Sequence, residues 1–216
     1  MRSSAAFFPC AFSYDEAMKN FILLFCTLLL FSSPKVFGAL SPVSVSIIPP
    51  IQIPPADFSV TGFRASLLWG HHRDLYGIDL GVLGNITDQD FIGVGVSGVF
   101  NLTFGNTNII GLQLAGITNI NKNKVSGFGF QIAGLANVNT AASSFSGLQV
   151  ALASNYSPFS TIYGAQVGLY NVANTVYGFQ IGLINITESL YGVQIGLANF
   201  NRKGLFSFAP ILNIGF

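Results

Sequence analysis

Two adjacent histidines and a nearby aspartate, His71, His72 and Asp74, are the side chains of this sequence best suited to chemistry. Imidazole nitrogens and a carboxylate bind zinc, and a histidine oriented by a carboxylate also serves as the base beside a nucleophile. The sequence holds only 2 histidines, and neighbouring residues on a strand point to opposite faces. We therefore interpret these residues as a polar connection between strands. We expect no catalytic, cofactor-binding or metal-binding residue, and no enzymatic activity.

A sequence repeat forms the secondary-structure elements that would position these side chains. Its units begin with glycine, an apolar residue, glutamine and another apolar residue, and they recur every 14 to 18 residues. In the last unit Tyr191, Val193 and Ile195 fall on one face, while Gln194 and its flanking glycines occupy the other. Alternation with period two indicates a β-strand with two different faces, and glycine at this frequency would weaken a helix. The leading glycines of the units are Gly62, Gly77, Gly93, Gly111, Gly129, Gly147, Gly164, Gly178 and Gly192.

One column of the repeat carries the glutamines, and in two early units a charged residue, Arg64 or Asp79, takes that place. These two residues lie on successive strands, so we expect them to pair, because an unpaired charge in an interior is costly. Almost all other charges fall between the units. Structural roles are predicted for both charged residues and for the column glutamines, Gln113, Gln131, Gln149, Gln166, Gln180 and Gln194.

The first 38 residues have the pattern of a cleaved signal peptide. Lys19 precedes an apolar run over residues 21–31, which is shorter than the roughly 20 residues that a membrane-spanning helix needs. Met18 lies where such a signal normally begins, so residues 1–17 are interpreted as a misassigned upstream start. Both cysteines, Cys10 and Cys26, belong to this segment, so the mature chain is expected to have no disulfide and no thiolate.

The composition narrows the class of protein. Half of the residues are hydrophobic and only 8% are charged, against about 25% in ordinary soluble domains. After the signal peptide, basic and acidic residues are equal in number and form no basic cluster. A membrane protein or a stacked architecture is therefore favoured, and nucleic-acid binding is not expected.

Two all-β, repeat-built architectures fit residues 61–216. The main expectation is a small transmembrane β-barrel of about ten strands, with the large apolar side chains facing lipid and the glutamine face lining the lumen. The alternative is a parallel β-solenoid, which would stack the glutamines, and the asparagines that follow each unit, into ladders. In the barrel Ile195 would face lipid and Gln194 the lumen. In the solenoid Ile195 would lie in a dry core and Gln194 would face solvent.

The two ends of this repeat domain have their own patterns. Residues 39–60 contain Pro49, Pro50, Pro54 and Pro55, so we expect an extended arm or an edge strand rather than a central strand. The final residues alternate and stop at Phe216. An apolar last strand that ends in phenylalanine resembles the signal that the bacterial outer-membrane assembly machinery recognises.

The repeated G-[LFVA]-Q-[ILV]-[GA]-L-x-N segments resemble those of bacterial surface-repeat proteins with tandem GLQ-x-GL-x-N segments. The proline-rich stretch at 49–55, the element at 62–64 and the closing residues 208–216 resemble the flanks of the same family. This chain departs from the pattern at Gly95, Ala115 and Ala133. The family has no assigned chemistry, so the resemblance implies a location more than an activity.

These observations predict a protein that is secreted across the inner membrane to the bacterial outer membrane or cell surface. Its expected role is structural or interactive, with a narrow channel as one form. The alternative function is a surface-displayed β-solenoid adhesin that binds host or neighbouring surfaces. The expected partners are outer-membrane lipid, the assembly machinery and a host or surface ligand, without any cofactor.

Overall fold

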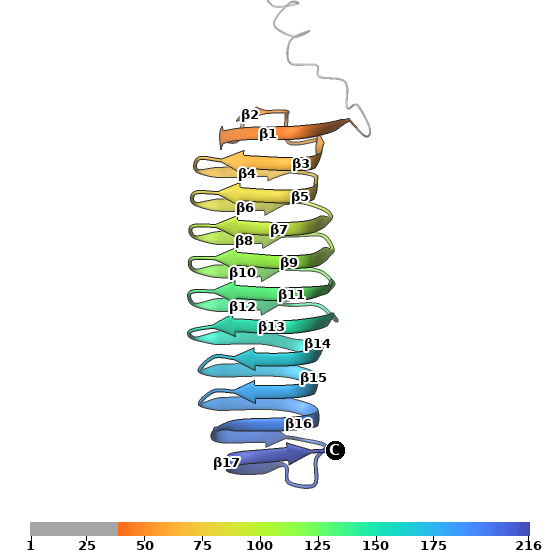
Figure 1. Cartoon of the computed structure of the whole chain (residues 1–216), viewed down its shortest axis with the longest axis vertical. Coiled ribbons are helices and arrows are strands. Elements are labelled where there is room, and N and C mark those ends of the chain that lie inside the picture. The colour runs from red at the N-terminus through yellow and green to blue at the C-terminus, as the bar shows by residue number, and fades with distance from the viewer. Residues whose placement is uncertain (1–38) are drawn as a thin grey trace, which may run out of the picture. The chain divides into compact units, whose positions relative to one another are not determined.

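A computed structural model describes residues 39–216, and in this part of the chain every regular element is a β-strand. The 17 strands form one continuous sheet that winds into a stack of coils, a β-solenoid (Figure 1). These residues contain no helix with the length and apolar character that crossing a membrane requires. The predicted signal peptide, residues 1–38, lies outside the described residues. The strands are β1 (Leu40–Ile48), β2 (Ile51–Ile53), β3 (Ser59–Ser66), β4 (Trp69–His72), β5 (Asp74–Gly81), β6 (Gly84–Thr87), β7 (Phe91–Ser97), β8 (Phe100–Thr103), β9 (Thr107–Ala115), β10 (Thr118–Asn121), β11 (Val125–Ala133), β12 (Ala136–Asn139), β13 (Ser144–Ala151), β14 (Ser154–Val167), β15 (Tyr170–Ile181), β16 (Ile184–Asn201) and β17 (Phe208–Gly215).

Each coil consists of a long strand and a short strand in two facing layers. Long strand β5 pairs in parallel with β7 of the next coil, and short strand β6 pairs in parallel with β8. From β14 onward the layers share strands: the first part of β14 pairs with the short strand β12, and its second part pairs with the long strand β13. Each repeat therefore supplies two stretches of strand, whereas the sequence pattern indicated one.

The β-barrel expectation is wrong, and the β-solenoid alternative describes the fold. A barrel of this kind needs antiparallel neighbours, but β9, β11 and β13 run parallel and in register. This pairing sets equivalent residues of successive repeats side by side, so Gly111 lies beside Gly129 and Gln113 beside Gln131. Amide side chains at equivalent positions can then hydrogen-bond from coil to coil.

The alternation of side chains is opposite to the one that the solenoid alternative predicted. Gln194 has 0% exposure, whereas Ile195 is 44% exposed. The interior contains amides, small residues and one apolar column near the start of the long strands, which includes Ile109, Phe145, Ile162, Val176 and Leu190. Stacked amides satisfy each other's hydrogen bonds, so a polar interior costs little here. The solenoid thus has the polar interior and apolar exterior that were expected of the barrel.

The leading glycine of each unit is required by the close stacking of coils. Gly178 has a φ of +137°, a region that residues with a side chain rarely adopt. A Cβ atom at this position would overlap the carbonyl oxygen of Gly164 in the preceding coil. The same overlap recurs at most leading glycines, which explains why glycine recurs at this place in the repeat.

Strands of a different kind cover the two ends of the stack. Residues 39–60 contain β1, which pairs in parallel with β3, and β2, which folds back antiparallel onto β1. At the other end β17 pairs antiparallel with β16. Pro210 lacks an amide hydrogen and Ile211 has a φ of +68°, so β17 offers an irregular edge to any further strand. Solenoids need such atypical terminal units because an open coil would expose its pairing groups.

Candidate functional site

The six column glutamines form an unbroken ladder inside the stack. From Gln131 onward, each Nε2 donates a hydrogen bond of 2.7–2.9 Å to the Oε1 atom of the glutamine in the preceding coil. Asn213 of β17 continues the ladder by donating to Gln194 Oε1 at 3.3 Å. All six side chains are buried: Gln113, Gln131, Gln149, Gln166, Gln180 and Gln194.

A second ladder runs through the first buried position of the short strands. From Asn85 to Asn185, the Nδ2 atom of each asparagine donates to Oδ1 of the asparagine in the following coil over 2.8–3.1 Å, so this ladder points opposite to the glutamine ladder. The first acceptor, Asn85 Oδ1, has no donor among the described residues, because Gly70 occupies the equivalent position one coil earlier. The ladder consists of Asn85, Asn101, Asn119, Asn137, Asn155, Asn171, Asn185 and Asn199.

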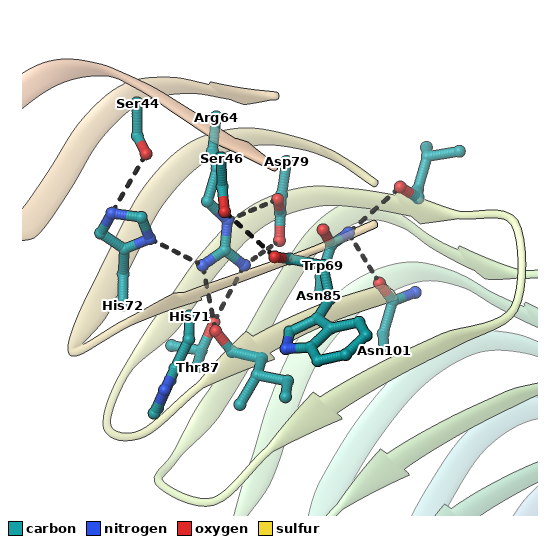
Figure 2. A network of polar contacts seen from close by, with 12 residues as sticks. Ser44, Ser46, Arg64, Trp69, His71, His72, Asp79, Asn85, Thr87 and Asn101 are labelled. Carbon is teal, nitrogen blue, oxygen red and sulfur yellow. Dashed lines mark hydrogen bonds and ion pairs between the residues drawn. The ribbon is translucent and has the colours of Figure 1, made fainter. Parts of the chain in front are cut away.

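Near the first coils the glutamine column becomes a buried ionic network (Figure 2). Arg64 Nε donates to Asp79 Oδ1 at 2.7 Å, and Arg64 Nη2 binds the other carboxylate oxygen. Arg64 Nη1 lies 3.3 Å from His72 Nδ1 and donates to the carbonyl of Ile86. The structure therefore brings together the two charged residues that the sequence predicted to pair. It adds His72, which the sequence pattern had placed in a polar connection.

Burial sets the protonation of this network. Desolvation, aided by the positive charge of Arg64, lowers the pKa of His72 to about 4. A neutral imidazole can accept from Arg64 at Nδ1 while Nε2–H donates to Ser44 or to the Pro54 carbonyl. Burial also raises the pKa of the Asp79 carboxyl, and the Arg64 guanidinium acts in the opposite direction. The network thus carries one tightly paired ion pair and a neutral histidine.

The three residues considered for chemistry in the sequence do not form one site. His72 is buried, whereas His71 on the outer side of β4 lies 2.8 Å from the Asp88 carboxylate (Figure 2 shows the two rings pointing apart). Asp74 is held instead by Ser59 and Arg73. Within residues 39–216, no three metal-ligating side chains converge on a point. His72 and Asp74 thus bond to residues of β3 through separate contacts.

The outer surface is the other distinctive feature, because both layers expose apolar side chains. On the long-strand layer Tyr163, Tyr177 and Tyr191 stack with ring centroids 4.9 and 4.6 Å apart. Beside them stand further columns of exposed or half-buried residues, among them Ile78, Leu80, Val94, Val96, Phe130, Ile132, Phe179, Ile181, Val193 and Ile195. The short-strand layer adds Ile86, Leu102, Ile120, Val138, Tyr156 and Ile186.

The two edges of the coils differ sharply. The turns that follow the long strands, at the arrowheads of β5, β7, β9 and β11 in Figure 1, carry exposed apolar residues. We call this row the apolar edge: Leu83, Val99, Ile117, Leu135, Leu152, Leu169, Leu183 and Leu197. The turns that precede the long strands form the opposite, charged edge: Asp57, Arg73, Asp88, Asp90, Lys122, Lys124, Glu188, Arg202 and Lys203.

Sequence reasoning missed the apolar edge, although a signal for it was present. All edge residues except Leu152 stand two places before the repeat asparagine, as Leu169 does before Asn171. The alternation suggested that this column ends a strand, but the column forms a turn. Phe216, predicted to be part of an assembly signal, is 99% exposed beyond β17.

Comparison of this chain with protein-family models, with curated proteins and with solved structures finds no match.

Proposed function

We propose that this chain is a non-catalytic attachment protein of a bacterial surface, a β-solenoid adhesin that binds host or neighbouring surfaces through its apolar exterior. The observation that carries the proposal is the exposure of aromatic and aliphatic columns on both layers, while the amides are buried. Soluble proteins rarely leave continuous apolar patches of this kind uncovered, and such patches commonly bind another surface. The predicted signal peptide and the resemblance to surface-repeat proteins support a location outside the inner membrane.

The filled interior of the solenoid does not favour the channel expected from the sequence. A channel needs an open lumen, whereas the described interior is filled by the glutamine and asparagine ladders. The buried Arg64–Asp79 pair blocks the same column near the first coils. Binding at the outer surface requires no opening through the stack.

Adhesion of bacteria that express the full chain tests the proposal. We expect these cells to adhere to hydrocarbon-coated beads and much less to hydrophilic beads. Replacing Phe130 and Phe179, both at least half exposed, by serine should lower this adhesion, because large apolar area is lost. The matched control, Lys122→Ser with Lys124→Ser, changes the charged edge alone and should adhere normally. Equal adhesion by the two double variants, at equal surface expression, would contradict the proposal.

A further inference from the structure

The apolar surface extends around three sides of the solenoid. The outward positions of the long strands, those of the short strands and the apolar edge all expose apolar side chains. Among residues 39–216, every exposed or half-buried Asp, Glu, Lys and Arg lies on the charged edge. A flat protein partner could cover only one of these three sides. A lipid phase can surround all three and leave the fourth in water.

In the coils that carry the tyrosine stack, the order of side chains matches the polarity gradient of a lipid leaflet. From the charged edge the chain passes Tyr177, then Phe179, then Ile181, and reaches Leu183 on the apolar edge. Tyrosine is enriched where headgroups meet hydrocarbon. Six residues of strand span about 20 Å, and one leaflet contributes about 15 Å of the hydrocarbon core. The apolar band is therefore deep enough to fill one leaflet.

The backbone of the apolar edge is also suited to lipid. Turns are normally excluded from hydrocarbon because their amide groups lack partners. Here the turn amides bond from coil to coil, as strand amides do. Val99 N donates to Leu83 O at 2.8 Å, and Ile117 N donates to Val99 O at 2.8 Å. The pattern continues with Leu135 N to Ile117 O at 2.7 Å.

An apolar groove lies at the same edge near the first coils. Its volume is about 540 Å³, and it crosses β1, β3, β5 and β7. Its lining is almost free of polar atoms and includes Val45, Ile47, Leu67, Leu80, Val82 and Val96. A groove of this composition can hold an acyl chain and offers nothing to a charged or hydrogen-bonding ligand.

From these observations we infer that the solenoid inserts edge-on into one leaflet of a lipid bilayer. The apolar edge points to the bilayer centre, the tyrosine stack lies at the headgroups, and the charged edge stays in water. An acyl chain occupies the groove. The inference rests on the proposed attachment function and names lipid as the surface that is bound.

Depth-dependent quenching tests this orientation. Single cysteines at Leu183, at Tyr177 and at Lys203 would carry an environment-sensitive fluorophore, in the full chain with Cys10→Ser and Cys26→Ser. On phosphatidylcholine–phosphatidylglycerol vesicles, nitroxides deep in the acyl chains should quench the label at 183 most strongly. Headgroup nitroxides should quench the label at 177, and the label at 203 should remain in water. Equal quenching at the three sites, or deepest quenching at 203, would overturn the inference.

A binding experiment separates lipid insertion from attachment in general. Leu169→Glu with Leu183→Glu should weaken vesicle binding at least about tenfold, since carboxylates are expelled from hydrocarbon. The control Lys122→Glu with Lys203→Glu leaves the apolar edge intact and should still bind uncharged phosphatidylcholine vesicles. Wild-type chain that fails to float with vesicles but still adheres to hydrocarbon-coated beads would refute the lipid inference and leave the proposed function standing. Loss of bead adhesion as well would refute both.

Discussion

Replacing Gln166 by leucine breaks the glutamine ladder between two of its shortest hydrogen bonds. Gln166 Nε2 donates to Gln149 Oε1 at 2.7 Å, and Gln166 Oε1 accepts from Gln180 Nε2 at 2.7 Å. Neither of those neighbouring atoms has another side-chain partner among the described residues. Leucine has a similar size but can neither donate nor accept a hydrogen bond. The substitution therefore leaves one acceptor and one donor unsatisfied on residues with 0% exposure.

The magnitude follows from those two orphaned groups. Each costs about 1–3 kcal/mol, and the buried leucine side chain recovers about 1–2 kcal/mol. The middle of these ranges gives a fall in the free energy of unfolding of about 2.5 kcal/mol. An Ala165→Leu control changes the adjacent outward position and should stay within about 0.5 kcal/mol of wild type.

Urea unfolding followed by circular dichroism would measure this difference, and hydrogen exchange would locate it. Because coils contact only their neighbours, protection should fall mainly in β13, β14 and β15. A Gln166→Leu protein as stable as wild type, with unchanged exchange in these strands, would show that the ladder contributes no net stability. The interior would then owe its order to backbone pairing alone.

Three further predictions concern the first coils and the glycine column. The pKa of His72 is about 4 in the folded chain, against an ordinary histidine value of 6.5 that we assign to the unfolded chain. As the pH falls, the unfolded chain therefore binds the proton first. The contribution of neutral His72 to the free energy of unfolding is fully present above about pH 6.5, and about 3 kcal/mol is lost towards pH 4. His72→Gln should remove that dependence in urea titrations run at several pH values. Arg64→Met leaves Asp79 unpaired in the interior and should cost about 3–5 kcal/mol. Arg64→Gln with Asp79→Gln, which places an amide at both positions, should be more stable in urea than Arg64→Met, and failure to recover stability would argue that the charges themselves are needed. Gly178→Ala forces a side chain against Gly164 and should cost more than about 3 kcal/mol; a thermal melt matching wild type would contradict the close stacking.

Strand character and the pairing of Arg64 with Asp79 could be predicted from the sequence, because both depend on local patterns. The alternation around Gln194 indicates a strand with two different faces. Arg64 and Asp79 share the glutamine column on successive strands, which predicts that they pair. The direction of strand pairing could not be predicted in this way, since period-two alternation is the same in parallel and antiparallel sheets. The four-residue strand Thr118–Asn121 was too short to show a pattern of its own.

The assignment of interior and exterior failed for a different reason. The expectation that a solenoid buries its isoleucines assumes that water is the surrounding solvent. Ile195 is 44% exposed and Gln194 is buried, because the amides gain directional bonds from stacking that isoleucine cannot provide. The alternation of apolar and polar residues is the same whether the outer face of the fold meets water or an apolar environment. The charged residues, confined to one edge, were the available clue.

The burial of the amides and the exposure of the apolar side chains also determine how the folded stack could be stabilised further. Each ladder hydrogen bond contributes about 1 kcal/mol net, whereas complete burial of a side chain such as Phe179 contributes about 1.5–3 kcal/mol. In water the chain obtains the first contribution but only part of the second, because its aromatic and aliphatic columns stay exposed. A phase that covers these columns binds the folded stack in preference to the unfolded chain, and so it raises the free energy of unfolding by linkage. Under the proposed function, the surface to which the protein attaches would supply the burial that the apolar exterior lacks in water.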